Sequence, residues 1–276
     1  MILTNVLKIS VKHVFLLMNI FLFAEFTLSA QDFEVAPVLV SFDANPGETQ
    51  SQTLHIRNHS NERQKFTLAL NDYIINEKGA KQAAEAGSTN RSLASWLNIN
   101  PSFLELNPNE SAEVQLTLNV PQNGFSTRWG MIPVEVAREQ SPSGVDKQLA
   151  TGILLVPRIL VLVKQSPRSN QNYSGTVNDL KEISKPDKNI RTFEATLVNT
   201  GDKVINAKCF LAVANIETME EEQQPPQNFT LYPGETRKVQ LSLKNELAPG
   251  QYAIAFLMDY GHKSAIEGAQ MLINVE

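Results

Sequence analysis

The sequence predicts an all-β protein made of two tandem immunoglobulin-like β-sandwiches. First, short segments with a period of two, separated by turn residues about every 8–12 positions, fill most of the 276 residues. Second, a proline turn precedes an alternating strand twice with the same spacing, as Asn107-Pro108-Asn109-Glu110 before 114–118 and as Tyr232-Pro233-Gly234-Glu235 before 239–243. Third, Gln165 to Gln171 has little apolar content and separates the two copies.

A proline turn before a strand can recur by chance in any all-β chain. In both halves, however, a glycine turn (Gly124, Gly250) and then an aromatic-bearing strand (from Trp129, from Tyr252) follow in the same order. A weaker copy of the turn lies at Asn45-Pro46-Gly47-Glu48. Two copies of one sandwich therefore explain the pattern better than chance does.

The N-terminus has the layout of a secretory signal. Lys8 and Lys12 precede an apolar run from Val14 to Phe23, which is too short for a comfortable membrane span, and no cysteine follows it to carry a lipid. The alternative is an uncleaved anchor. We expect an exported protein with no stable membrane span after signal removal, divided into a signal peptide at 1–30, an N-terminal domain at 31–165 and a C-terminal domain at 166–276.

The composition is that of a folded protein, with 42% hydrophobic and 19% charged residues. The formal net charge is -5, and no basic stripe with interleaved aromatic residues occurs. Both observations argue against a polyanionic partner, so we expect no nucleic-acid binding.

The elements follow from the same patterns in chain order. The region 76–91 is polar and unpatterned, and we expect a surface loop there with one helical turn at 81–86. The stretches 139–147 and 217–227 are also expected to be loops. Strands are expected at 33–42 (interrupted by Pro37), 53–57, 65–73, 96–99, 114–120, 131–137, 152–163, 193–198, 204–213, 239–243, 252–258 and 269–275.

The run from Gly152 to Val163 is the candidate functional stretch because both faces of this strand are apolar. Such a strand is either buried on both faces or presents an apolar stripe to a partner, and the sequence does not separate these readings. Pro157 favours a sheet edge. Arg158 must reach solvent, an acid or a ligand carboxylate. The candidate partner-binding residues are Ile153, Leu154, Val156, Arg158, Leu160 and Leu162.

Catalysis has little support in the sequence. His55 and His59 are four apart on a strand and its turn, a spacing that does not bring them together, and no nucleophile elbow or phosphate-binding glycine loop is present. Cys209 is the single cysteine and lies in an apolar run, so we expect a buried, inert thiol. Trp96 and Trp129 are expected in the core. We therefore expect no catalytic residue, no cofactor and no metal.

Two motifs carry a family resemblance. The segment from Trp96-Leu97-Asn98-Ile99-Asn100-Pro101 through Leu106-Asn107-Pro108-Asn109-Glu110 to Val114-Gln115-Leu116 resembles the strand, proline turn and strand of periplasmic pilus chaperones, the PapD-like family. Met258-Asp259-Tyr260-Gly261 is similar to the Asp-Tyr-Gly that ends a strand in their second domain. The resemblance rests on short motifs, but its layout covers most of the mature chain.

The resemblance implies that a long strand of the first domain fills the open groove of a pilus subunit. It also implies that two basic residues in the interdomain cleft bind the subunit's terminal carboxylate. The position of the anchor lysine falls at Leu160 or, with a two-residue shift, at Arg158, and that of the first-strand arginine at Leu39 or a neighbour. Pro157 would remove one hydrogen bond to a partner strand if its nitrogen faced outward.

A second similarity is to WxL-interacting two-domain surface proteins, which end with a Leu-x-Pro-Gly-x-Tyr strand like Leu247-Ala248-Pro249-Gly250-Gln251-Tyr252. These proteins bind peptidoglycan and a protein partner. We therefore expect a non-enzymatic, chaperone-like protein of the bacterial periplasm or cell envelope that holds another exported protein, a pilus subunit or a surface protein, by edge-strand addition. The alternative is a cell-surface adaptor that binds peptidoglycan and tethers another surface protein.

Overall fold

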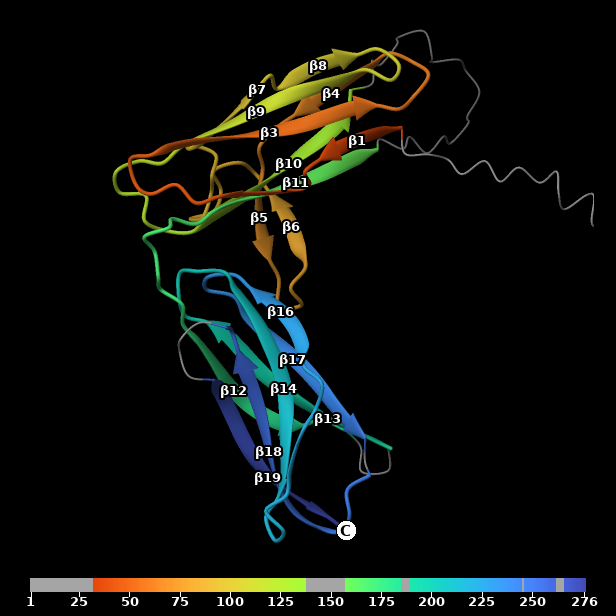
Figure 1. Ribbon diagram of the computed structural model, residues 1–276, viewed down its shortest axis with the longest axis vertical. Helices are drawn as coiled ribbons and strands as arrows, with labels where there is room; N and C mark the ends of the chain where they lie inside the picture. The colour runs from red at the N-terminus through yellow and green to blue at the C-terminus, as the bar shows by residue number, and fades with distance from the viewer. Residues whose placement is uncertain (1–31, 138–156, 185–188, 245, 262–265) are drawn as a thin grey trace, which may run out of the picture.

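The computed structural model describes residues 32–137, 157–184, 189–244, 246–261 and 266–276. They form two immunoglobulin-like β-sandwiches in tandem, each around its own buried core, so the fold class predicted from the sequence is confirmed (Figure 1). The signal peptide expected at 1–30 lies outside the described residues. Within the described ranges, no helix has the length and apolar character needed to cross a membrane.

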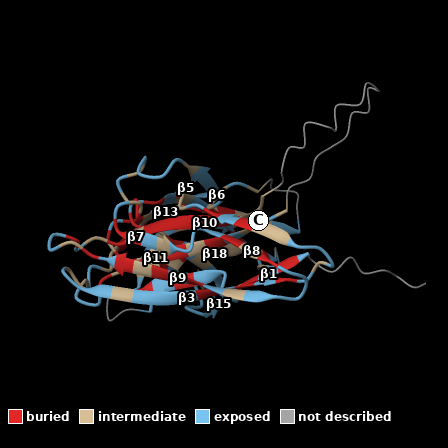
Figure 2. Ribbon diagram, turned by 90° about the horizontal axis from the view of Figure 1, so that it is seen from above, coloured by how far each residue is buried: buried red, intermediate tan, exposed pale blue. Residues whose placement is uncertain are grey.

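In the first sandwich, a 4-stranded sheet in the order β1-β3-β9-β7 faces a 5-stranded sheet in the order β2-β11-β10-β4-β8. The core lies between the sheets because every second side chain of a strand points inward, as Leu54 and Ile56 do on β3 and Val161 and Val163 on β11. Figure 2 shows the buried stretches of the strands in red. The strands are β1 (Phe33–Ala36), β2 (Leu39–Phe42), β3 (Thr49–Asn58), β4 (Gln64–Leu68), β7 (Leu97–Asn100), β8 (Phe103–Leu106), β9 (Ser111–Asn119), β10 (Arg128–Val136) and β11 (Arg158–Gln165).

The chain changes sheet at two prolines. Between β1 and β2 it passes from the 4-stranded to the 5-stranded sheet at the cis bond Ala36-Pro37, and between β7 and β8 it does the same at the cis bond Asn100-Pro101. After the first change β2 pairs with β11 in parallel, with Leu162 opposite Leu39. The interruption expected at Pro37 is therefore a sheet change, and it places β2 beside the candidate strand.

A separate hairpin, β5 (Asp72–Ile75) and β6 (Lys81–Ala84), projects from the first sandwich toward the second (Figure 1). The ladder between β4 and β10 ends at Leu68 opposite Val134, and the next residue of β10 in that direction, Pro133, has no N–H to donate. The chain then makes only one isolated bridge to β10, at Asn71, before it leaves as β5. The helical turn expected at 81–86 is wrong, because 81–84 pairs with β5 as a strand.

The second sandwich repeats this architecture. A 3-stranded sheet in the order β12-β13-β17 faces a 5-stranded sheet in which β14 pairs with β15, β16 and β18, and β18 pairs with β19. The strands β8, β12 and β16 were not expected from the sequence, and β15 lies within a predicted loop. The strands are β12 (Gly175–Glu182), β13 (Ile190–Asn199), β14 (Ile205–Asn215), β15 (Glu221–Gln223), β16 (Gln227–Leu231), β17 (Thr236–Lys244), β18 (Gly250–Asp259) and β19 (Glu267–Val275).

The repeated proline turn has the same geometry in all three copies. Its third residue has a positive φ, at +83° for Gly47, 62° for Asn109 and +78° for Gly234, as a type II turn with proline at the second position requires. The glutamate that ends each turn also accepts a hydrogen bond from the backbone N–H of the first residue, at 2.8 Å for Glu48, 2.7 Å for Glu110 and 2.8 Å for Glu235. Each turn is thus closed by its own carboxylate.

A buried asparagine holds this turn in each sandwich. The Nδ2 of Asn58, at the end of β3, donates to the carbonyls of Glu62, Leu106 and Asn107 at 2.7 to 3.1 Å. The Nδ2 of Asn199, at the end of β13, donates to the carbonyls of Lys203 and Leu231 at 2.8 and 3.0 Å. The internal repeat predicted from the proline turns therefore extends to a polar contact between strands that the sequence pattern did not show.

Candidate functional site

The candidate strand β11 is covered on one side along its whole length and on the other side along only half. β10 pairs with it from Arg158 to Gln165. β2 pairs with it only from Leu162 to Gln165. Within the described part of the chain, the four positions 158–161 therefore have an edge with no strand beside it. The edge position expected from Pro157 holds for this half of β11 only.

The open edge presents the backbone groups of two residues. The N–H of Leu162 donates to the carbonyl of Val38 at 2.9 Å, so the backbone groups of Leu162 face the β2 side. Backbone groups alternate along a strand, so those of Leu160 and Arg158 face that side as well. Pro133 on β10 lies opposite Leu160 and has no N–H to donate to it, which agrees with a Leu160 carbonyl that points away from β10. The same alternation turns the nitrogen of Pro157 toward β10, so its ring removes no hydrogen bond to a strand on the open edge.

Apolar side chains flank the open edge on the outer face of the sheet. Leu160 is 43% exposed, and Val38 and Leu39 on the adjoining segment are 45% and 68% exposed. Leu162 shares this face but is partly buried against Tyr73, Trp129 and Met131. The outer face of β11 is thus apolar, exposed at Leu160 and partly buried at Leu162. It therefore shows in part both the burial and the exposed apolar stripe that the sequence left as alternatives.

The predicted site residues have different positions. Ile153, Leu154 and Val156 lie outside the described residues. Arg158 is on the surface, with 59% of its side chain exposed, and forms a local ion pair with Glu135 at 3.5 Å. An exposed pair of this kind contributes little to stability, so the guanidinium remains accessible. Arg158, Leu160 and Leu162 share one face of β11, and their role in binding stays a prediction.

Two basic residues meet at the junction between the sandwiches. Lys203, in the turn between β13 and β14, is buried, and its ammonium donates to Ser166 Oγ at 2.9 Å and to the carbonyl of Pro167 at 2.8 Å. Burial lowers the pKa of Lys203, and the nearby ammonium of Lys164 on β11 lowers it further. This pair was not predicted from the sequence, because no local pattern links two lysines on different domains.

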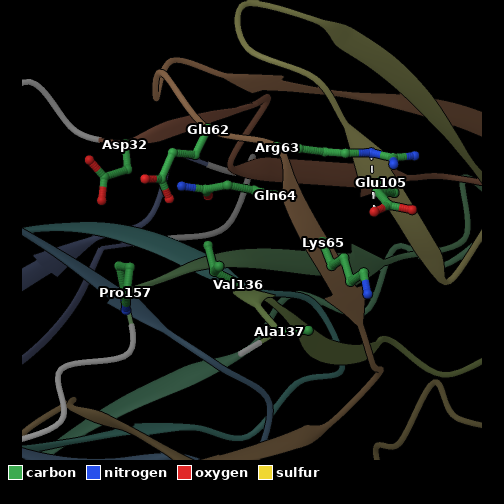
Figure 3. Close-up of a pocket in the computed structure, with 9 residues that line it drawn as sticks. All are labelled: Asp32, Glu62, Arg63, Gln64, Lys65, Glu105, Val136, Ala137 and Pro157. Atoms are coloured by element: carbon green, nitrogen blue, oxygen red, sulfur yellow. Dashed lines mark ion pairs between the residues drawn. The ribbon is translucent and has the colours of Figure 1, made fainter. Parts of the chain in front are cut away.

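A polar hollow of about 520 Å³ lies at the far end of β11, next to Pro157 (Figure 3). On one side Arg63 forms an ion pair with Glu105 at 3.1 Å, and on the other the carboxylates of Asp32 and Glu62 face the hollow (Figure 3). Its composition suits water and charged side chains better than an apolar ligand. The residues that line it are Asp32, Glu62, Arg63, Gln64, Lys65, Glu105, Val136, Ala137 and Pro157.

In the described ranges, the histidines and the cysteine lie far apart or have local partners. His55 lies 3.6 Å from Glu113 and His59 lies 3.0 Å from Glu34, both on the surface. Cys209 is buried as expected, and burial raises the pKa of its thiol to about 12. Trp96 and Trp129 are buried as well. Among the described residues, no group of three or more histidine, cysteine, aspartate or glutamate side chains is placed to hold a metal ion.

Comparison with known proteins places the fold. No family model matches the sequence, and no curated protein sequence matches it. A chain of the chaperone–tip adhesin complex of CFA/I fimbriae biogenesis has a TM-score of 0.51 and 13% identity, over 88% of this chain and 98% of that one. The class 5 fimbriae chaperone CfaA has a TM-score of 0.48 and 14% identity (88% and 99%), and the E. coli chaperone DraB 0.44 and 11% (86% and 95%).

The two sandwiches and the half-open strand define a class of two-domain immunoglobulin-like proteins with an accessible sheet edge. Within that class, the chain has the fold of the PapD-like fimbrial chaperones. The resemblance predicted from the proline turn and the Asp-Tyr-Gly motif is confirmed at the level of fold. At 13% identity the likeness concerns architecture, and the function must be argued from this chain's own residues.

Proposed function

We propose that this protein holds another exported protein, such as a pilus subunit or a surface protein, by adding a strand of that protein to the open edge of β11. The observation that carries the proposal is the outward direction of the backbone groups of Arg158 and Leu160, beside which the described chain places no strand. An extended segment laid there would gain main-chain hydrogen bonds that are otherwise made to water.

Side chains around the edge would give the interaction its selectivity. Leu160 and Leu39 would lose water-exposed apolar surface under a partner strand, and buried apolar area contributes about 25 cal/mol per Å². Arg158 can exchange its exposed contact with Glu135 for a carboxylate of the partner. At the other end, Lys164 is the more accessible member of the basic pair with Lys203, so it is the better candidate to receive a negative group of the partner.

The proposed action involves no catalysis, no cofactor, no metal and no nucleic acid. It places the mature protein in the periplasm or cell envelope of a bacterium, because subunits that need strand addition are themselves exported. The TM-score of 0.51 to a chain of a chaperone–tip adhesin complex supports this proposal through the fold.

The test is a charge on the open edge. We expect Leu160→Glu to reduce recovery of the partner roughly tenfold, because a carboxylate cannot be buried there without a counter-charge. The exported proteins encoded beside this gene would be co-expressed one at a time with the tagged chain, and the co-purified amount measured. Leu272→Glu is the matched control, since Leu272 is an exposed leucine (60%) on β19 of the second sandwich. Unchanged recovery with Leu160→Glu, in a variant with a normal thermal melt, would rule out this edge.

The adaptor function has one observation in its favour. Phe125 is 62% exposed beside a hollow of about 370 Å³ lined by hydroxyl and amide side chains, including Ser169, Gln171 and Asn172. An aromatic ring next to amides suits the apolar face and the hydroxyl groups of a sugar. If the chain binds wall glycan there, it should sediment with purified peptidoglycan, and Phe125→Ala should abolish this while Leu160→Glu does not. Absence of wild-type sedimentation excludes the adaptor function.

A further inference from the structure

The hairpin β5–β6 is anchored firmly at its root in the first sandwich. The buried carboxylate of Asp72, at the start of β5, accepts hydrogen bonds from the N–H and hydroxyl of Thr89, both at 2.9 Å, and from the hydroxyl of Ser92 at 2.6 Å. The indole of Trp129 on β10 donates to the carbonyl of Tyr73 at 3.1 Å. A hairpin of two short strands is only marginally stable alone, so these contacts explain why it keeps a fixed direction.

The hairpin and β10 together form an aromatic socket for one residue of the second sandwich. Tyr232, the first residue of a proline turn, lies with its ring 5.1 Å from that of Trp129 and 6.1 Å from that of Tyr73. Its hydroxyl lies 3.1 Å from the hydroxyl of Tyr73. The ammonium of Lys81 on β6 lies 5.6 Å from the centre of the same ring. Three residues of the first sandwich therefore surround one side chain of the second.

The tip of the hairpin makes a second contact with the other domain. Gly79 has a φ of +79°, and a Cβ at this position would overlap the guanidinium of Arg237 on β17. That guanidinium cannot move aside freely, because its Nε donates to Glu235 at 2.7 Å and its Nη2 to the carbonyl of Thr230 at 3.0 Å. Glycine is thus required at the tip both by its backbone conformation and by the closeness of Arg237.

A second link between the sandwiches lies beside the aromatic socket, at Arg91, whose guanidinium is 6.0 Å from the ring of Trp129. Asp202, in the turn after β13, forms an ion pair with Arg91 and accepts hydrogen bonds from the N–H of Thr127 at 3.1 Å and from Asn170 Nδ2 at 2.6 Å. In Figure 1 the connecting segment between β11 and β12, residues 166–174, descends at the left, whereas the hairpin reaches the second sandwich near β16. Contacts at the socket alone would allow the second sandwich to swing about them, whereas the added contact of Gly79 with Arg237 at the hairpin tip resists this motion.

We propose that the hairpin β5–β6 is a strut that fixes the angle between the two sandwiches. It contacts the second sandwich at Tyr232, which packs on Tyr73, and at Arg237, which lies against Gly79. The default expectation for two domains joined by a short segment is relative motion. The strut instead holds the second sandwich in one orientation relative to β11, whose Lys164 end meets it at the junction. The consequence for a partner rests on the proposed function, whereas the strut itself does not.

The test measures the distance between the sandwiches without any partner. Spin labels would be attached to cysteines introduced as Gln52→Cys on β3 and Lys208→Cys on β14, both at exposed positions. The Cys209→Ala background removes the single native cysteine. Double electron–electron resonance should give one narrow distance distribution for this parent. We expect Tyr232→Ala and Gly79→Val each to widen it at least about twofold, as for domains free to move.

Two controls separate the strut from general damage. Gly87→Val introduces the same strain at a φ of +81° where a Cβ meets nothing within 4 Å, and it should leave the distribution narrow. Tyr232→Phe keeps the ring and removes only the hydroxyl contact, so it should widen the distribution less than Tyr232→Ala. A distribution that stays narrow in both Tyr232→Ala and Gly79→Val, but widens in Asp202→Asn, would assign the rigidity to the contacts of Asp202 and overturn the strut.

Discussion

At the scale of single residues, buried polar side chains do the most specific work. Asn58 and Asn199 occupy equivalent places, and each connects the end of one strand to carbonyls beside a proline turn. Their backbone N–H groups donate to the carbonyls of Glu110 and Glu235, the last residues of those turns, at 3.0 Å each. The turns can be predicted from the sequence because proline, glycine and glutamate form a local motif. The asparagines cannot, because their partners lie far away in the chain.

This role predicts a large stability loss for Asn58→Ala. The substitution would remove the Nδ2 donor from three carbonyls. Those of Glu62 and Asn107 keep the Ser60 hydroxyl at 2.8 Å and the Glu110 N–H at 3.1 Å, so we expect a loss of about 1–3 kcal/mol in the free energy of unfolding. Urea denaturation followed by tryptophan fluorescence measures it. Asn123→Ala, at an exposed position, is the control and should change stability by less than about 0.5 kcal/mol. A loss for Asn58→Ala as small as that of the control would show that water replaces the side chain.

At the scale of elements, β11 illustrates where pattern reading succeeds and stops. Its continuous apolar run predicted a strand over 152–163, and the strand is present from Arg158 to Gln165. Whether a strand has a free edge depends on which distant segment pairs with it. Here β2 covers only the second half, because the chain enters this sheet after Pro37 and Leu39 falls opposite Leu162. No property of the apolar run itself states that register.

The alternation of backbone groups along β11 predicts that two neighbouring proline substitutions lower the stability of the fold by very different amounts. Ile159 faces β10, so Ile159→Pro should remove a sheet hydrogen bond and destabilise the fold by about 3 kcal/mol or more. Leu160 faces the open edge, so Leu160→Pro should cost much less stability yet weaken partner recovery. Chemical denaturation and co-purification would be measured on both variants. Equal destabilisation by the two prolines would contradict the proposed direction of the open edge.

At the scale of the whole molecule, the two sandwiches share one architecture and are joined by contacts between residues of both domains. The domain limits of 31–165 and 166–276 stay a prediction, although each core is assembled from one side of that boundary. The junction brings together Tyr73 with Tyr232, and Lys164 with Lys203. If the strut holds, a partner on β11 meets a surface whose shape is set by both sandwiches.

The architecture was readable from local order. Alternating strands bury one face by geometry, and the proline turn with its closing glutamate occurs in both halves of the chain, so two similar sandwiches followed from the residues in sequence. The open half of β11, the hairpin between the domains and the paired lysines needed the folded chain. Each depends on segments separated by many residues, and their mutual distance is decided by packing, on which a linear pattern carries no information.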